Sequence, residues 1–338
     1  MKYVFFVLLA LSFCCPPAPA HAARFALLLE NPLDEQGWNA QLALGVKQAA
    51  ERWHIQGDIL IETQAEKQAA LFTRAATEYD LVLINSPAFL ELLKKNAGNF
   101  PKTRFGSIEI ALSAENIMSV LFDDGDIAFL AGAAAAIVSQ SPQIPNIRQK
   151  KEVGWVNALN NPVHQNLFNA FAMGVHTIDP AIRVTEKVLG SYDDPALGRS
   201  VGHLLYADMD VVGFAAGASG LGGLEAAKET GRYAFGMDSN QDALAKGHVI
   251  FSLLKRPDKA VSLLVQHYME KTFTGRTVLH LGLADGSVGI TDMKVFKQAL
   301  GKNFPPDLER RIQELRYEIE KGTIKTQTRK KGELCDCL

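Results

Sequence analysis

Short apolar runs alternate with longer amphipathic segments along most of the chain. This order is typical of parallel β-sheets in which each strand is joined to the next by a crossover helix. The first series of expected strands covers residues 24–29, 58–62, 81–84, 103–108 and 117–122, with expected helices over 38–53, 65–79 and 88–97. Together these segments predict one complete doubly wound α/β lobe.

A second series with the same order follows a polar, proline-containing connection over residues 139–150, which has the composition of an exposed linker. Its expected strands cover 152–156, 183–189, 210–214 and 233–237, with helices over 162–176, 195–206 and 220–230. The remaining segments are too few for a third domain, so we expect them to complete both sheets. The prediction is two Rossmann-like lobes joined by a multi-strand hinge: an N-terminal lobe of residues 24–122 and about 242–285, and a C-terminal lobe of residues 123–241 and about 286–326.

The first 22 residues have the layout of a secretory signal peptide. A lysine precedes an apolar run over Tyr3–Phe13, and small residues around Ala20 and Ala22 form a cleavage site. The apolar run is too short to span a bilayer. The sequence therefore predicts cleavage near Ala22 and a periplasmic location for the mature chain.

The cysteines lie near the two ends of the chain. A competing interpretation of the N-terminus makes Cys14 or Cys15 a lipidated membrane anchor, although the bulky preceding phenylalanine disfavours it. Cys335 and Cys337 are separated by one residue, so a bond between them would constrain almost nothing, and two ligands alone leave a metal site incomplete. We interpret residues 327–338 as a disordered tail.

Charge and motifs argue against several function classes. The chain has 338 residues with 35 Lys plus Arg and 37 Asp plus Glu, so no basic excess indicates a nucleic-acid partner. It has no H-E-x-x-H zinc motif and no G-x-S-x-G nucleophile elbow. The acidic run Asp123–Asp126 lacks the spacing of a calcium loop and is interpreted as a helix cap. We expect no catalytic residue, metal or cofactor, which favours a binding function.

Aromatic and small residues lie in loops that follow predicted strands, where open α/β sheets hold ligands. Asp34, Trp38 and Asn39 follow the first strand, and Trp38 can offer a flat face to a planar ligand. Phe214 and Gly217 belong to a glycine-rich loop in the second series. There Phe214 supplies an opposing aromatic face and Gly217 permits close approach of the backbone. The alternative for Trp38 is packing within its own lobe.

Charged residues also stand at strand ends. Glu109 ends one strand, Asp238 ends another, and Lys255 follows the apolar run over residues 249–254. Carboxylates there suit the adjacent hydroxyls of a sugar, and the lysine can donate to the ligand and balance the negative charge. Taken singly, the acids are helix caps and the lysine a solvated surface residue. Their shared position at strand ends favours a ligand site.

Several motifs occur in the order seen in one known family. They are D-E-Q-G-W-N, N-I-M-S-V-L-F, F-L-A-G, F-A-A-G-A-S-G-L-G-G, G-M-D-S-N-Q and S-L-L-K-R. With them the sequence resembles, from about residue 24 to residue 325, the basic membrane protein family of substrate-binding proteins, whose characterised type is the purine nucleoside receptor of bacterial ABC transporters. The resemblance implies a type I periplasmic binding fold.

By position, the resemblance implies a purine ring sandwiched between Trp38 and Phe214, with Asp34 and Asn39 near the base. It places the ribose hydroxyls against three charged residues: Glu109, Asp238 and Lys255. Two positions depart from the family pattern, because Glu109 replaces the usual Asp and Trp38 replaces the usual Phe. Both changes keep the chemical type but alter the width of the site.

The resulting hypothesis is an extracytoplasmic, monomeric solute-binding protein. It captures a nucleoside-like small molecule by hinge closure and delivers it to ABC permease subunits in the membrane. One rival is a ligand-sensing subunit that docks a membrane signalling receptor through the same fold. Another is a nucleoside-processing enzyme with Glu109 or Asp238 as general base.

Overall fold

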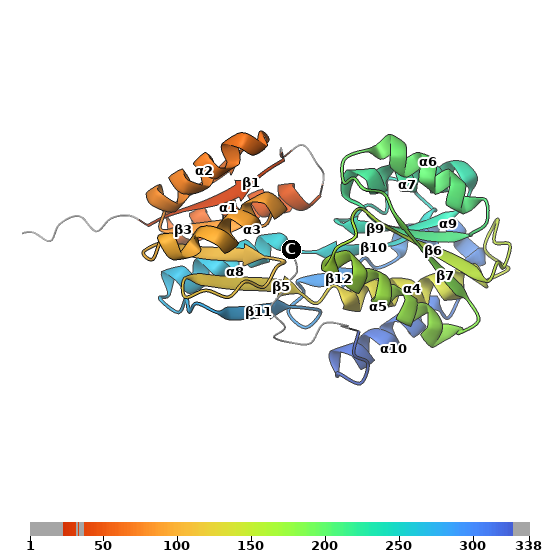
Figure 1. Ribbon diagram of the computed structural model, residues 1–338. Helices are drawn as coiled ribbons and strands as arrows, with labels where there is room; N and C mark the ends of the chain where they lie inside the picture. The colour runs from red at the N-terminus through yellow and green to blue at the C-terminus, as the bar shows by residue number, and fades with distance from the viewer. Residues whose placement is uncertain (1–22, 32, 34–36, 327–338) are drawn as a thin grey trace, which may run out of the picture.

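Two six-stranded sheets form the centres of two lobes that lie side by side (Figure 1). The computed structural model describes residues 23–31, 33 and 37–326. The predicted signal peptide, Cys14, Cys15, Asp34 and the predicted tail with Cys335 and Cys337 lie outside these residues. Within the described chain, the predicted fold class of two doubly wound α/β lobes is confirmed.

The first sheet is entirely parallel and has the strand order β11-β5-β4-β3-β1-β2. Its strands are β1 (Arg24–Leu29), β2 (Gln56–Ile61), β3 (Leu81–Ile84), β4 (Arg104–Ile108), β5 (Ile117–Phe122) and β11 (Thr277–Leu281). The central strands β1 and β3 are continuous apolar runs, because helices cover both faces of a parallel sheet. The edge strand β2 is more exposed and carries polar residues, which discourages pairing with other chains.

The second sheet has the order β12-β10-β9-β8-β6-β7, and only β12 runs antiparallel to its neighbour. Its strands are β6 (Glu152–Asn157), β7 (Arg183–Val188), β8 (Val211–Ala215), β9 (Tyr233–Asp238), β10 (Val249–Lys255) and β12 (Val288–Ile290). The edge strand β7 is again polar and partly exposed. The two lobes therefore repeat one architecture.

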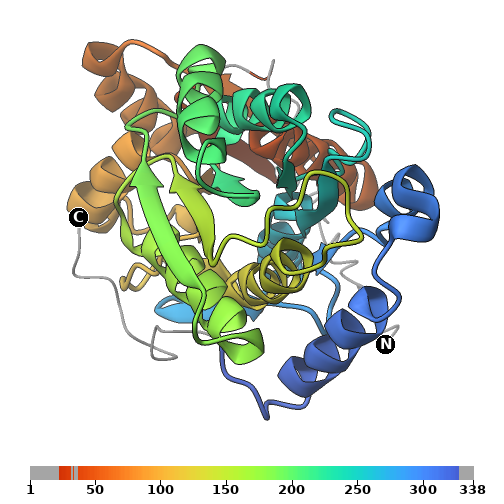
Figure 2. The same cartoon turned by 90° about the vertical axis from the view of Figure 1, so that its right-hand side faces the viewer.

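Helices cover both sheets. Around the first sheet lie α1 (Trp38–Trp53), α2 (Ala65–Glu78), α3 (Pro87–Asn96) and α8 (Pro257–Met269), with the short 3₁₀ helix η1 (Ala97–Asn99). Around the second lie α4 (Gly125–Ser139), α5 (Pro162–Ile178), α6 (Pro195–Tyr206), α7 (Gly217–Thr230), α9 (Lys294–Leu300), η2 (Gly301–Asn303) and α10 (Leu308–Glu320). Figure 2 shows the molecule from the side of this second lobe, with α10 along its flank.

The Ala-rich helix α4 is the most buried helix of the second lobe. It crosses α5 closely, since a Cβ atom on Gly132 would lie 1.9 Å from the Phe171 carbonyl oxygen and one on Gly174 would lie 2.0 Å from the Phe129 carbonyl oxygen. Burial within the second lobe accounts for the apolar composition of α4. Among the residues that the structure describes, no helix has the length and hydropathy needed to cross a bilayer.

The position of β10 corrects one predicted lobe boundary. Residues from about 242 were assigned to the N-terminal lobe, but β10 pairs with β9 in the second sheet. The apolar residues of β10 are buried on both faces of this sheet. The loop between β9 and β10 leads the chain back so that β10 runs parallel to β9. The second of the crossings between lobes, which returns the chain to the N-terminal lobe, therefore follows Lys255 and precedes α8.

The lobes are joined by three chain crossings: between β5 and α4, between β10 and α8, and between β11 and β12. At the first of them, Asp123 donates its backbone N–H to the Leu281 carbonyl at 2.8 Å. Its carboxylate also lies 3.0 Å from the His280 ring nitrogen Nδ1. Hydrogen bonds between crossings tie the strands of the hinge to one another.

Candidate functional site

Lys255 links the two lobes. It ends β10 in the second sheet, and its ammonium donates to the carboxylate of Glu109, which follows β4 in the first sheet. Its Nζ also lies 3.2 Å from Oδ2 of Asp124, at the start of α4. Lys255 is 5% exposed, so the ammonium is shielded from water. The structure thus brings together two of the predicted site residues and adds Asp124, which the sequence analysis had interpreted only as a cap.

The charge of this cluster is negative overall. Burial by itself lowers the pKa of Lys255, but the charges of Glu109, Asp124 and Asp238 outweigh burial and raise the pKa above its ordinary value. The lysine is therefore an ammonium at neutral pH. Three carboxylates surround one cation, and Asp124 also accepts a hydrogen bond from the Asn166 amide at 3.3 Å. Such a cluster suits a neutral, donor-rich ligand better than an anion.

Trp38 lies beside the same lysine. The Lys255 Nζ atom is 4.7 Å from the centroid of the Trp38 ring and 5.3 Å from that of Phe122, within the range of cation–π attraction. The two rings meet edge to face with centroids 5.8 Å apart. Asn39, in the first turn of α1, is buried. Trp38 therefore lies beside the lysine that joins the two lobes, while Asp34 lies outside the described residues.

Glu109 and Asp238 have unusual backbone conformations. Their φ angles are +74° and +65°, in the left-handed region that residues other than glycine seldom adopt. Each follows or ends a strand, one in each sheet. Strain of this kind costs on the order of 1–3 kcal/mol and gathers at functional sites. The matching conformations support treating the two carboxylates as parts of one site.

Phe214 does not form the predicted second aromatic wall. Its side chain is 2% exposed, and its ring lies 6.4 Å from that of Tyr206, between the sheet and helices α6 and α7. A Cβ on Gly223 would come within 2.5 Å of the Phe214 ring. Successive side chains of a strand point to opposite faces of the sheet, and Phe214 points to the face that α6 and α7 cover. It is a core residue.

Tyr192 is a second aromatic residue of this lobe, and unlike Phe214 it is not part of the core. It lies in the loop after β7, and its ring is 41% exposed. The Ser219 N–H holds the Tyr192 carbonyl at 2.9 Å, and a Cβ on Gly217 would lie 3.4 Å from the ring atom Cδ1. Gly217, with φ +54°, therefore permits close approach of Tyr192. The signal was available in the sequence, because Tyr192 is an aromatic residue in a strand-end loop of the second lobe.

The Tyr192 hydroxyl lies within electrostatic reach of the charged cluster. Burial, followed by the negative charge of Glu109, raises the pKa of Tyr192 to about 12. Asp238 raises the pKa further, whereas Lys255 lowers it. The hydroxyl is therefore protonated at neutral pH. Trp38 contacts the lysine of the charged cluster, and Tyr192 lies near enough to feel the same charges.

A known family accounts for this architecture. The model of the ABC transporter substrate-binding protein PnrA-like family matches residues 22–323. The chain belongs to this family. Basic membrane protein A1 of Borrelia garinii subsp. bavariensis is 25% identical over 88% of this chain and 86% of its own length. Basic membrane protein B of the same organism is 30% identical over 58% of each chain.

Solved structures of other proteins share the two-lobed fold. An ABC transporter system solute-binding protein from Aeropyrum pernix K1 has a TM-score of 0.80 at 23% identity and covers 91% of this chain and 95% of its own. A periplasmic solute-binding protein from Actinobacillus succinogenes, solved with bound D-allose, has a TM-score of 0.64 at 14% identity, covering 82% and 99%. Both likenesses concern the fold alone. By its family, the protein is an ABC transporter solute-binding protein.

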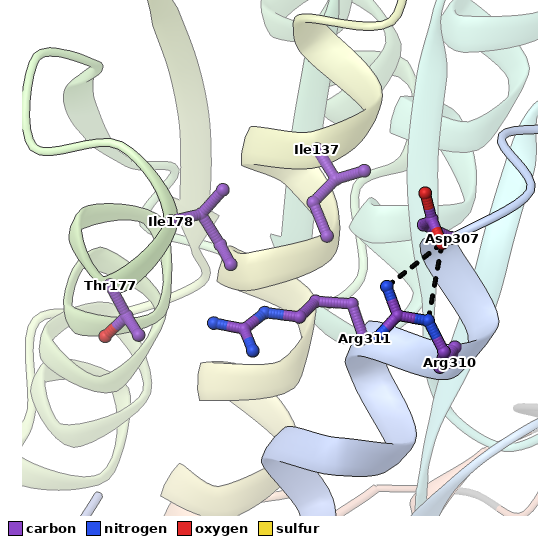
Figure 3. A pocket seen from close by; sticks show the side chains of 6 residues that line it. All are labelled: Ile137, Thr177, Ile178, Asp307, Arg310 and Arg311. Carbon is purple, nitrogen blue, oxygen red and sulfur yellow. Dashed lines mark hydrogen bonds and ion pairs between the residues drawn. The ribbon is translucent and has the colours of Figure 1, made fainter.

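A surface pocket in the second lobe lies elsewhere. It has a volume of about 290 Å³ and is lined by Ile137, Thr177, Ile178, Asp307, Arg310 and Arg311 (Figure 3). Arg310 is held by Asp307 at 3.0 Å and by Glu314 at 2.5 Å. Thr177 is near the end of α5, whose opposite end carries His164 beside Tyr192, about 20 Å away at 1.5 Å per helical residue. This pocket is not part of the interlobe cluster.

The described residues contain no group of three or more His, Cys, Asp or Glu side chains arranged to hold a metal ion. The acidic run over residues 123–126 instead contributes Asp123 to the hinge and Asp124 to the lysine cluster. Asp126 accepts a hydrogen bond from Thr326, which brings the end of the described chain back to the start of α4. These residues therefore organise the crossing between the lobes.

Proposed function

We propose that this protein captures a purine nucleoside, or a closely similar ligand, between its lobes and delivers it to an ABC permease in the membrane. Export through the predicted signal peptide would place it in the periplasm, where it acts as a monomer. The observation that carries the proposal is the interlobe cluster in which Lys255 contacts Glu109, Asp124 and the Trp38 ring. Family membership supports the transport role.

The aromatic residues would hold the base. Trp38 comes from the N-terminal lobe and Tyr192 from the C-terminal lobe, so closure would bring two flat faces onto one planar ligand. Stacking of a base on an aromatic side chain contributes about 1–3 kcal/mol. Asn39 and Asp34 remain our candidates for the edge of the base, because both belong to the loop and helix start that carry Trp38.

The charged residues would hold the sugar. Glu109 and Asp238 accept hydrogen bonds from adjacent ribose hydroxyls, and Lys255 donates to a hydroxyl or ring oxygen. The lysine already contacts Glu109 from the other lobe, so a ligand joins an existing interlobe connection. Hinge motion at the three crossings then closes the lobes on the ligand. The negative balance of the cluster disfavours the phosphate group of a nucleotide.

Isothermal titration of the mature chain with adenosine, guanosine, inosine and ribose tests the proposal. We expect at least one nucleoside to bind well, and its 5′-monophosphate at least tenfold more weakly. Asp238→Asn keeps a side chain that tolerates positive φ and should weaken nucleoside binding by about tenfold. The matched control is Asp208→Asn, which changes an exposed carboxylate at the far end of the same lobe. No binding of any nucleoside would contradict the proposal.

A further inference from the structure

A buried asparagine in the second lobe has a defined orientation. The Trp155 Nε1–H group donates to Oδ1 of Asn157 at 2.7 Å, and an indole nitrogen can only donate. The Asn157 Nδ2 group faces the Glu186 carboxylate at 2.8 Å, which can only accept when it is ionised. Both contacts agree, so the amide oxygen and nitrogen of Asn157 are assigned by their partners.

This orientation determines which nitrogen of His164 carries the proton. His164 Nδ1 lies 3.3 Å from the Asn157 oxygen, which accepts, so Nδ1 must donate. The ring is 6% exposed, and burial, aided by the charge of Lys255, lowers the pKa of His164 to about 4. A neutral imidazole carries one proton. At neutral pH, therefore, His164 Nε2 is bare and accepts hydrogen bonds.

The acceptor nitrogen faces a tyrosine in the loop after β7. His164 Nε2 lies 2.7 Å from the Tyr192 hydroxyl, so the tyrosine O–H donates a hydrogen bond to this nitrogen. Asn161 makes a further side-chain hydrogen bond to this hydroxyl that lowers the pKa of Tyr192, as expected for a donor to the oxygen. One lone pair of the Tyr192 oxygen remains, in a group of charges formed by Glu109, Asp238 and Lys255.

We infer that the Tyr192 hydroxyl is a dedicated hydrogen-bond acceptor for an O–H or N–H group of the ligand, and that His164 is the positioning residue that holds it in this role. The inference rests on the proposed nucleoside site and refines its specificity. A ligand with a hydroxyl or amino group at this point is selected. A ligand with a carbonyl or ring nitrogen there would place lone pair against lone pair and bind roughly tenfold more weakly.

The orientation of the hydroxyl is testable without any ligand. Nitrogen-15 NMR of the mature chain at pH 7 should show His164 with Nδ1 protonated and Nε2 bare. Tyr192→Phe should shift the Nε2 resonance, because it removes the hydrogen-bond donor, and leave the Nδ1 proton in place. A protonated Nε2 would overturn the inference, because His164 would then donate to the tyrosine and free the hydroxyl proton for the ligand.

Binding measurements test the role in selection. Titrations would compare the best nucleoside with its 2′-deoxy, 3′-deoxy, 5′-deoxy and des-amino analogues, in the wild type and in Tyr192→Phe. Tyr192→Phe keeps the ring and should weaken the parent nucleoside roughly tenfold, but one analogue should bind both proteins equally, because it lacks the donor that Tyr192 accepts. His164→Leu should repeat this pattern across the same analogues.

The matched control is His203→Leu, since His203 is an exposed histidine of the same lobe that pairs with Glu229. It should leave all five affinities unchanged. An equal loss for every analogue, or no loss in Tyr192→Phe, would overturn the inference while the proposed function stands. A wild-type protein that binds no nucleoside would instead overturn the proposed function, and with it the ligand assigned here, whereas the NMR result would still decide the orientation of the hydroxyl.

Discussion

The two lobes repeat one architecture, but different interactions hold the candidate site residues of each lobe in place. On the N-terminal lobe, Glu109 and Trp38 are held by charge, because the Lys255 ammonium reaches them from the opposite lobe. On the C-terminal lobe, Tyr192 is held by neutral hydrogen bonds that run through His164 to Asn157. Ion pairs connect the two lobes, whereas the neutral hydrogen bonds from Tyr192 through His164 to Asn157 all lie within the C-terminal lobe. Substitutions should therefore distinguish the ion pairs that connect the lobes from the hydrogen bonds that position Tyr192.

The largest effect is expected from Lys255→Met. The change leaves Glu109 and Asp124 close together without their shared cation, and removing one partner of a buried ion pair costs about 3–5 kcal/mol. We expect that loss in the free energy of unfolding at pH 7, measured with urea, together with loss of nucleoside binding. Lys246→Met, an exposed lysine of the same lobe, is the control and should change stability by less than about 0.5 kcal/mol. Similar values for both variants would show that the cluster does not connect the lobes.

Substitution of Phe214 and of Tyr192 should affect stability and nucleoside binding in opposite ways. Phe214→Ala empties a site in the core and should lower the free energy of unfolding by about 3–5 kcal/mol. Tyr192 is 41% exposed, so we expect Tyr192→Ala to cost less stability than Phe214→Ala but about 1–3 kcal/mol in nucleoside binding. Denaturation and titration of both variants check this division. A reversed pattern would restore Phe214 as the aromatic wall.

Acid should lower the free energy of unfolding through protonation of His164. An unfolded histidine gains a proton near pH 6.5, but His164 in the fold does so only near its lowered pKa of about 4. Between these values the unfolded state binds more protons, so stability falls as the pH falls from 6.5 towards 4. The contribution is on the order of 3 kcal/mol. Urea denaturation at pH 7 and pH 4.5 should show a smaller drop in His164→Leu than in the wild type.

The control for acid sensitivity is His54→Asn. His54 is exposed and has φ +51° after α1, a conformation that asparagine also tolerates. This variant should keep the pH dependence of the wild type. If it loses the same part of the pH dependence as His164→Leu, the effect is not specific to the buried ring.

The smallest effect is expected from Arg311→Ala, at the pocket in Figure 3. Its side chain is 44% exposed and lies 3.3 Å from Glu314, and exposed ion pairs contribute about 0–1 kcal/mol. We expect a change of less than about 0.5 kcal/mol in stability and an unchanged nucleoside affinity by titration. A tenfold loss of affinity would place the ligand at this pocket and contradict the interlobe site.

Much of the fold followed from local patterns. The predicted limits of the first strand and first helix, 24–29 and 38–53, are those of β1 and α1, because apolar periodicity and helix-forming composition are local properties. Lobe membership was harder. The apolar run of β10 suits the interior of either sheet, and only pairing with β9 assigns it to the second.

The site followed the same division. Glu109 and Lys255 could be found from their positions just after apolar runs, since the carboxyl ends of parallel strands gather at one edge. Phe214 was misassigned because both faces of a parallel sheet are covered, so an aromatic residue in a strand gives no sign of which face it joins. Tyr192 was missed because its position depends on contacts with Gly217 and Ser219 at the start of α7, which lie far from it in the sequence.

By itself, the sequence determined the two-lobed α/β class, the order of strands and helices, and the charged residues that end the strands, because these depend on periodicity over a few residues. Only the tertiary structure decided that β10 belongs to the second sheet, that Phe214 is a core residue, and that the Tyr192 hydroxyl meets His164. Each of these depends on contacts between residues far apart in the chain. Pairing, burial and hydrogen-bond direction arise only when those residues meet in the folded protein.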